Sequence, residues 1–137
     1  MEKECKTLYI NVDQKSYPCA VSFVMDFIGG RWKAVILCHL KNGDKRFGEL
    51  KKELFFITET TLSIQLRQLE RDQLITRTVF GTKPPVKVVY SLSDLGLSFI
   101  PLLNHINDWG KTILESKKNT LKFDVLNLNI SLNKTPQ

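Results

Sequence analysis

The sequence predicts an α+β fold, mostly α, in which four helices precede a β-hairpin and one long helix follows it. Two observations lead to this prediction. Apolar residues recur three and four positions apart from residue 20 to residue 72 and again after residue 93, as they do along one face of a helix. Between these regions, residues 74–92 are rich in strand-forming side chains around a central turn. The 137 residues are enough for one such domain with its own core.

Two helices separated by a pair of glycines are expected first. One covers residues 20–28, and Gly29-Gly30 ends it because glycine accepts the left-handed cap conformation without steric cost. The next covers about residues 31–41, and its apolar stripe consists of Trp32, Val35, Ile36, His39 and Leu40. His39 is interpreted as a partly buried packing residue, with a ligand or proton-switch role as the alternative.

The third and fourth helices are expected to form a helix-turn-helix. A short helix over residues 46–54 turns its apolar side chains inward, and a tight apolar turn over 55–57 follows it. Thr58 is a suitable N-cap for a longer helix over 59–72, because its hydroxyl can accept a hydrogen bond from the first turn. Leucines at steps of four and three mark the buried face of that helix: Leu62, Leu66 and Leu69.

A β-hairpin follows the helix-turn-helix directly. Residues 74–80 and 86–92 are rich in β-branched and aromatic residues, and the Gly-Thr-Lys-Pro-Pro segment between them is typical of a turn. This order of elements is the layout of a winged helix-turn-helix with a two-stranded wing.

The last helix begins near Ser93 and carries more apolar surface than a small domain can cover. Its apolar residues are spaced alternately four and three positions apart, as in a coiled coil. Pro101 should kink or split the helix. We therefore expect a homodimer, with an interface that includes Phe99, Leu102, Leu103, Ile106, Trp109 and Ile113. The alternative is that this helix folds back on its own domain.

These elements define one domain, residues 18–117, between two outer segments. Residues 1–17 are expected to be a flexible or loosely docked N-terminal arm. The C-terminal tail, residues 118–137, shows strand-like alternation of apolar residues, which indicates pairing or docking on the dimer.

The exposed side of the fourth helix has the chemistry of a DNA-reading surface. An α-helix fits the major groove, so a reading helix needs an apolar back and a polar front. The candidates for contacts with base edges are Thr60, Thr61, Ser63, Ile64 and Gln65. The candidates for contacts with the DNA backbone are Lys45, Arg46, Arg67, Gln68, Arg77, Thr82, Lys83 and Lys87. For Arg67, an ion pair with Glu70 is the alternative. The net charge of +6 favours a polyanionic partner but does not decide the matter.

Several short motifs in this order resemble the HxlR-type regulators, a branch related to the MarR family. The resemblance covers about residues 18–110 and rests on Pro18-Cys19-Ala20-Val21, Asp26-Phe27-Ile28-Gly29-Gly30-Arg31-Trp32, Arg46-Phe47-Gly48-Glu49-Leu50, Leu66-Arg67-Gln68-Leu69-Glu70, Val89-Tyr90-Ser91-Leu92-Ser93 and Asp108-Trp109-Gly110. It implies a transcription regulator whose first and last helices form the dimer interface, which adds Phe23 and Phe27 to that surface. It also implies a palindromic operator with two half-sites. We expect a repressor, and activation is the alternative.

Two departures from the family pattern are visible. Cys-Ala-Val stands where Cys-Pro-Val is common, and Glu59-Thr60-Thr61 replaces the usual small-residue or proline start of the reading helix. The second departure leaves the operator sequence open.

Cys19 is a candidate sensor of oxidants or electrophiles. Many members of the family carry a cysteine at this position, and some of them sense through it. Independently, Cys19 lies at the start of the first helix, where the partial positive charge favours the thiolate. The alternatives are a packing residue and regulation by a small ligand in the interface, with no thiol chemistry.

Other classes of protein are disfavoured. No segment has the roughly 18 consecutive apolar residues of a membrane span or the apolar core of a signal peptide, so a cytoplasmic location is expected. Three cysteines, an odd number, argue against a disulfide framework, and their spacing with the two histidines does not indicate a metal site. No catalytic motif or phosphate-binding glycine loop indicates an enzyme or a cofactor. The remaining rival is a winged helix that binds proteins instead of DNA.

Overall fold

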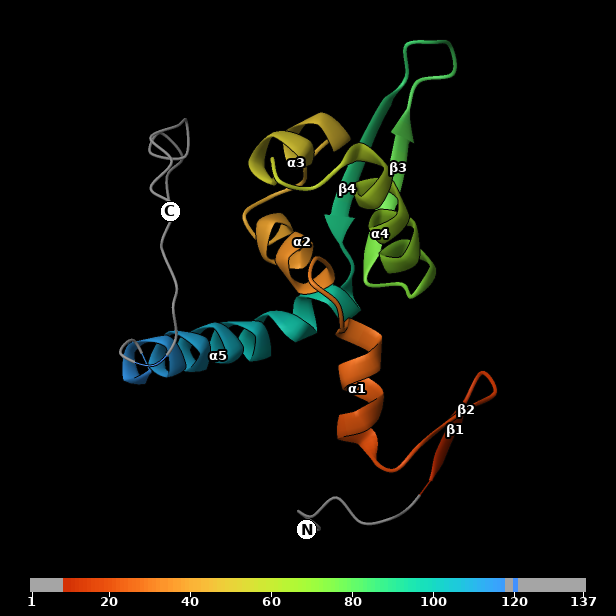
Figure 1. Cartoon of the computed structure of the whole chain (residues 1–137). Coiled ribbons are helices and arrows are strands. Elements are labelled where there is room, and N and C mark those ends of the chain that lie inside the picture. The colour runs from red at the N-terminus through yellow and green to blue at the C-terminus, as the bar shows by residue number, and fades with distance from the viewer. Residues whose placement is uncertain (1–8, 118–119, 121–137) are drawn as a thin grey trace.

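The computed structural model describes residues 9–117 and residue 120 and has the predicted mostly helical α+β architecture. Its elements are β1 (Ile10–Val12), β2 (Lys15–Tyr17), α1 (Ala20–Ile28), α2 (Lys33–Leu40), α3 (Phe47–Glu53), α4 (Glu59–Arg71), β3 (Ile75–Phe80), β4 (Lys87–Leu92) and α5 (Asp94–Ser116). In Figure 1, α2, α3, α4 and the β3–β4 hairpin form one body, from which α1 and α5 project in different directions. The apolar alternation of the tail falls outside the described residues. None of the helices in the described part combines the length and apolarity that a bilayer crossing requires.

The hydrophobic core lies where α2, α3, α4, the base of the hairpin and the first turns of α5 meet. Its fully buried side chains are Ile36, Leu37, Leu50, Leu62, Leu66, Leu69, Leu74 and Ile75. In α2 the sequence placed Val35 in the buried stripe and left out Leu37, whereas Leu37 is fully buried and Val35 is 37% exposed. Apolar residues surround most of α2, so spacing alone did not identify its inward face.

The predicted start of α4 is confirmed. The Thr58 hydroxyl accepts a hydrogen bond of 3.1 Å from the backbone N–H of Thr61, which satisfies one of the donors left open in the first turn. The leucines at positions 62, 66 and 69 are all buried against the core. They hold one side of α4 in the protein and leave the other side at the surface.

The wing is an antiparallel pair in which Ile75 lies opposite Leu92 and Phe80 lies opposite Lys87. On its other edge, β4 exchanges backbone hydrogen bonds of 3.0 and 2.8 Å between Tyr90 and Lys45. The chain segment just before α3 is therefore attached to the wing, which fixes the wing relative to the helix-turn-helix.

The final helix, α5, is continuous over 23 residues and contains Pro101 within it. Ser93 caps its first turn, because its hydroxyl accepts a 3.0 Å hydrogen bond from the N–H of Gly96. The same hydroxyl donates to the carbonyl of Gln73, 2.6 Å away, and so joins α5 to the start of the wing. The expected division of the helix at Pro101 is not seen.

Gly96 lets the start of α5 approach the start of the wing closely. A Cβ atom at this position would lie 2.2 Å from the backbone oxygen of Leu74, whereas one at Gly110 of the same helix would meet nothing within 4 Å. Gly96→Ala is therefore expected to lower the free energy of unfolding by about 1–3 kcal/mol, because α5 or β3 must shift. Urea denaturation measures this, with Gly110→Ala as the matched control. Equal stability of the two variants would contradict the close approach.

An N-terminal hairpin occupies part of the segment that the sequence assigned to a loose arm. Its strands β1 and β2 join through Asp13 and Gln14, both with positive φ, as in a tight hairpin turn. The hairpin is attached to α1: the Tyr17 hydroxyl and the Lys15 amine donate to the Asp26 carboxylate over 2.6 and 3.3 Å. The hydrogen bond from Tyr17, with help from Lys15, lowers the pKa of Asp26 below its ordinary value.

Candidate nucleic-acid interface

The outward side of α4 is a row of exposed side chains opposite the three buried leucines. Thr60, Ile64, Arg67 and Arg71 follow one another at steps of four, three and four, so they share one face of the helix. All four are exposed, and Ile64 keeps 42% of its surface in solvent. Two of the predicted base-reading residues, Thr60 and Ile64, thus lie at the front of the helix.

The other predicted base-reading residues lie on the flanks of α4. Thr61, Ser63 and Gln65 are half-buried, as is Gln68. The Thr61 hydroxyl accepts a 2.9 Å hydrogen bond from the Thr58 hydroxyl, so its side chain belongs to the cap of the helix. The front is therefore narrower than the sequence indicated.

A polar concavity separates α4 from the wing. It is lined by Ser63, Arg67, Glu70, Arg77 and Tyr90. Two predicted backbone-binding residues, Arg67 of α4 and Arg77 of β3, are brought together here. Within the described residues Arg67 forms no ion pair with Glu70. Sequence reasoning did not include Tyr90, because its place in this concavity depends on the pairing of β3 with β4.

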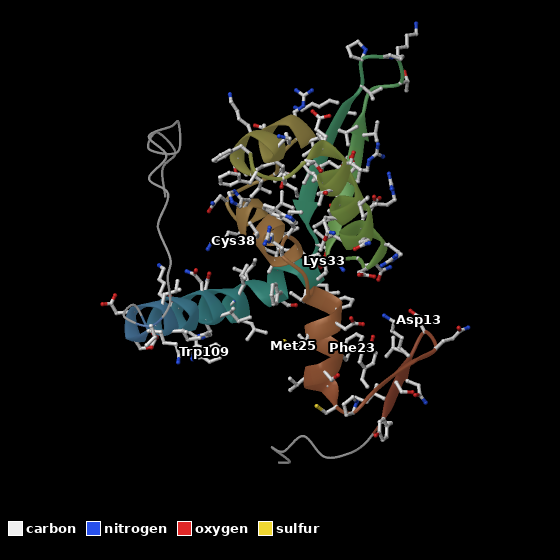
Figure 2. All side chains as sticks on the ribbon, viewed as in Figure 1. Asp13, Phe23, Met25, Lys33, Cys38 and Trp109 are labelled. Carbon is white, nitrogen blue, oxygen red and sulfur yellow. The ribbon has the colours of Figure 1, made fainter. Side chains whose placement is uncertain are left out.

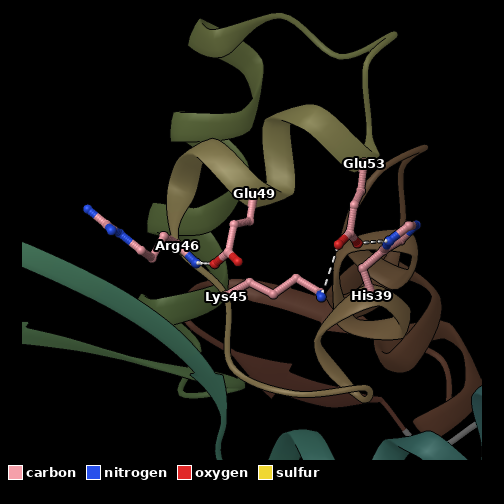
Figure 3. Close-up of polar contacts among 5 residues, drawn as sticks. All are labelled: His39, Lys45, Arg46, Glu49 and Glu53. Carbon is pink, nitrogen blue, oxygen red and sulfur yellow. Dashed lines mark hydrogen bonds and ion pairs between the residues drawn. The ribbon is translucent and has the colours of Figure 1, made fainter. Parts of the chain in front are cut away.

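Lys45, a predicted contact with the DNA backbone, is paired within the protein. Its amine forms an ion pair of 3.0 Å with Glu53, and its side chain is only 16% exposed (Figure 3). His39 contacts the other carboxylate oxygen of Glu53 at 2.7 Å. Burial raises the pKa of Glu53, but the hydrogen bonds from His39 and Lys45 outweigh burial, so the pKa lies below its ordinary value. This cluster joins α2, α3 and the segment between them.

Arg46 lies next to Lys45 but is exposed. Its backbone N–H donates to the Glu49 carboxylate over 2.8 Å and so closes the first turn of α3. Figure 3 shows its guanidinium directed away from the Glu53 cluster. Arg46 is therefore the cation before α3 that remains available to a partner.

The remaining predicted backbone contacts lie on the distal half of the wing. Thr82 and Lys83 are exposed in the loop between β3 and β4, which Figure 1 shows projecting beyond the helices. The Lys87 amine lies 5.9 Å from the centre of the Phe80 ring, within the range of a cation–π contact.

A second surface, on α1 and α5, is apolar and exposed. No residue of α1 is buried, and Val21 and Met25 on one of its sides are 53% and 60% exposed. On α5, Leu102, Ile106 and Trp109 are 48%, 43% and 67% exposed, and Ile113 is half-buried. Within the described residues, nothing covers these side chains.

Four residues predicted for the dimer interface make contacts within the protomer, and their part in an interface stays a prediction. Phe99 and Leu103 belong to the protomer's own core. Phe23 stacks on Phe27 at 5.3 Å between ring centres and also contacts Tyr17 of the N-terminal hairpin. Residues two apart on a helix point to nearly opposite sides, so Met25 points away from Phe23 (Figure 2).

Cys19 is half-buried at the N-cap position of α1, directly after the N-terminal hairpin. Its carbonyl accepts the backbone hydrogen bond of Phe23, 3.2 Å, which starts the helix. Cys38 is half-buried within α2 and packs against the core. Cys5 lies outside the described residues.

Taken together, these elements define a winged helix-turn-helix protein of the kind that regulates transcription. The model of the HxlR-like helix-turn-helix family matches residues 27–118, and the chain belongs to this family. The chain is 46% identical over 93 residues to YdeP of Bacillus subtilis (strain 168), an uncharacterized HTH-type transcriptional regulator, across 68% of this chain and 72% of the relative.

Solved structures with the same fold include two regulators whose redox states were studied. The redox regulator HypR in its reduced form has a TM-score of 0.66 and 38% identity, over 71% of this chain and 98% of HypR. The reduced form of the transcriptional regulator YodB from B. subtilis has a TM-score of 0.63 and 27% identity, over 71% of this chain and 94% of YodB. The family and these relatives are transcriptional regulators.

Proposed function

We propose that the protein binds a palindromic operator in double-stranded DNA as a homodimer and represses transcription there. The observation that carries this proposal is the two-sided character of α4. Its leucines are buried and hold it in place, while Thr60, Ile64 and Arg67 form an exposed front. A helix of this kind fits the major groove, where base edges present distinct patterns of donors, acceptors and methyl groups.

Each exposed group has a chemical counterpart in DNA. The Thr60 hydroxyl can donate to or accept from a base edge, and the Ile64 side chain suits the methyl group of thymine. Arg46 before α3 and Lys83 at the tip of the wing lie on elements that flank α4, where phosphates of the same duplex would pass. We therefore expect α4 to contact the bases, and Arg46 and Lys83 to contact the DNA backbone on either side of α4.

The exposed apolar surface of α1 and α5 supports assembly with a second copy. Both helices project from the body and keep large apolar side chains in solvent, including Met25 and Trp109. Covering them against the same surface of another copy gives a two-fold dimer. The two α4 helices would then contact half-sites about 34–36 Å apart, one turn of DNA.

Binding of the full chain to the promoter region of its own gene tests the proposal. Affinity for this duplex should exceed that for a scrambled duplex by about 1,000-fold or more and should fall steeply as salt rises. Equal, salt-insensitive binding of both duplexes would contradict DNA reading and favour an apolar protein partner.

We also propose that oxidation or alkylation of Cys19 weakens operator binding. The position of Cys19 supports this proposal. Cys19 immediately precedes α1, so it lies between the N-terminal hairpin and a helix of the proposed dimer surface. A modified sulfur is larger and more polar than a thiol, so it would change how the hairpin and α1 pack.

Cys19→Ser is expected to bind the operator as the wild type does and to lose its response to hydrogen peroxide, which oxidises a single thiolate to a sulfenic acid and is reduced to hydroxide. Operator affinity before and after peroxide treatment measures this. Cys38→Ser is the matched control, because Cys38 lies within the core-facing part of α2 and should leave the response intact. A Cys19→Ser protein that still releases DNA on oxidation would contradict the sensor role.

A further inference from the structure

The outer edge of β4 is joined to the helix-turn-helix at Lys45, and this residue is held from both of its ends. Its backbone exchanges hydrogen bonds of 3.0 and 2.8 Å with Tyr90 of β4. Its side-chain amine forms an ion pair of 3.0 Å with Glu53, the last residue of α3. One residue therefore links the position of β4 to that of a carboxylate on α3.

The ion pair between Lys45 and Glu53 is partly shielded from water. The two side chains keep only 16% and 25% of their surface in solvent. An ion pair at the open surface contributes little, because water replaces each partner, but a shielded charge that loses its partner is costly. The Lys45 amine can regain water only if the segment before α3 moves, and such a movement would disturb the hydrogen bonds to Tyr90.

The Glu53 carboxylate is held from a second side by His39 of α2. The Nδ1 atom of the His39 ring lies 2.7 Å from one oxygen of the carboxylate, and the Lys45 amine contacts the other oxygen (Figure 3). With a partner on each oxygen, the carboxylate has little freedom to rotate. Glu53 thus offers Lys45 a fixed anchor that is built from α2 and α3.

We propose that Glu53 is a positioning residue for DNA binding, which sets the place of the wing relative to α4 through Lys45. The inference rests on the proposed function, because a duplex that contacts both α4 and the wing binds best when the two are already in one fixed arrangement. Glu53 itself would not contact DNA, since its carboxylate oxygens are directed to His39 and Lys45. Lys45 would act through its backbone contact with β4 instead of through a phosphate.

Glu53→Gln separates a positioning role from a simple effect of charge. The substitution removes a negative charge, and that change alone should favour a polyanion such as DNA. The positioning role predicts the opposite sign: operator binding should weaken about 3- to 30-fold, because the Lys45 amine loses its charged partner. Glu49→Gln is the matched control on the same helix, since glutamine can also accept the hydrogen bond from the Arg46 N–H. Binding by Glu53→Gln as tight as that by Glu49→Gln would overturn the proposal.

Lys45→Met tests whether Glu53 acts through the lysine amine. This variant keeps the backbone and the apolar stem of the side chain, and it should weaken operator binding by a similar factor. In the Lys45→Met background, Glu53→Gln should add no further loss, because the two residues act as one unit. The slope of log affinity against log salt should stay unchanged in Lys45→Met, since the amine displaces no counterion from DNA. A slope lowered by about 1 would make Lys45 a phosphate contact and would overturn the proposal, as would independent losses in the double variant.

Hydrogen exchange of the Tyr90 and Lys45 amides, measured in the full chain without DNA, tests the link between Glu53 and the wing independently of the operator. Both amides donate in the bridge between the two residues. In Glu53→Gln they should exchange about 10-fold faster or more, whereas the amide of Leu66 in the core should not change.

Unchanged exchange of both bridge amides in Glu53→Gln would overturn the proposal, whatever the operator titrations give. If the Leu66 amide also loses its protection, the fold itself is weakened, and Lys45→Met, which leaves no lysine charge without a partner, becomes the variant that decides. Faster exchange at the bridge in a protein whose wild type binds no duplex would support Glu53 as the residue that holds the wing and would refute the proposed function alone.

Discussion

Trp109→Glu combined with Met25→Glu is expected to convert the protein into a monomer and to weaken operator binding about 100- to 10,000-fold. Both side chains are largely exposed, at 67% and 60%, so the protomer should fold normally. Two carboxylates buried in an apolar dimer surface without partners would, however, disfavour association strongly. The loss of affinity follows because two linked half-site contacts become one.

Sedimentation and operator titration measure the two effects. Asn107→Glu is the matched control, since Asn107 is exposed on α5 but lies outside the row of Leu102, Ile106 and Trp109. A double variant that stays dimeric, or a monomer that binds the full operator as tightly as the wild type, would contradict the proposed interface.

Leu66→Ala is expected to lower the free energy of unfolding by about 2–5 kcal/mol, because it opens a cavity under α4. Leu66 is 1% exposed and belongs to the main core cluster. Leu66→Met, which keeps the volume, should lose less than about 1.5 kcal/mol. Urea denaturation of both variants provides the measurement.

Ile64→Ala separates stability from DNA reading on the same helix. Its side chain is 42% exposed, so its removal should change stability little while reducing the preference of the protein for its operator. If Leu66→Ala proved as stable as Ile64→Ala, α4 would not be held by its leucines as described.

Local features of the fold were predictable from the sequence because the residues that decide them are close together in the chain. Thr58 caps α4 three residues ahead of its hydrogen-bond donor, and the buried leucines follow the helical repeat. Ser93 caps α5 in the same way. The winged layout followed from the order of such segments.

Features that depend on contacts between distant residues were not predictable. Glu53 and Lys45 are eight positions apart, and nothing in their spacing indicates that the Lys45 amine turns back to the protein. The contacts of α5 within the protomer were also not predicted, since its apolar residues exceed one face and only packing selects Phe99 and Leu103 for the core.

The N-terminal hairpin gave a weaker signal than most hairpins. Its turn is Asp13-Gln14, and glutamine is an unusual residue at positive φ, where glycine or asparagine is favoured. The apolar positions around it, Ile10, Val12 and Tyr17, are too few to show alternation clearly. Its attachment to Asp26 of α1 became visible only in three dimensions.

Photo-crosslinking from position 64 tests most directly whether the front of α4 enters the DNA. Ile64→p-benzoylphenylalanine, irradiated on the operator, should crosslink to bases at two positions about one helical turn apart, one for each protomer. The same group at Ile113 of α5, Ile113→p-benzoylphenylalanine, should crosslink to the partner protomer and not to DNA. Crosslinks to DNA from position 113 but none from position 64 would contradict the placement of α4 in the major groove.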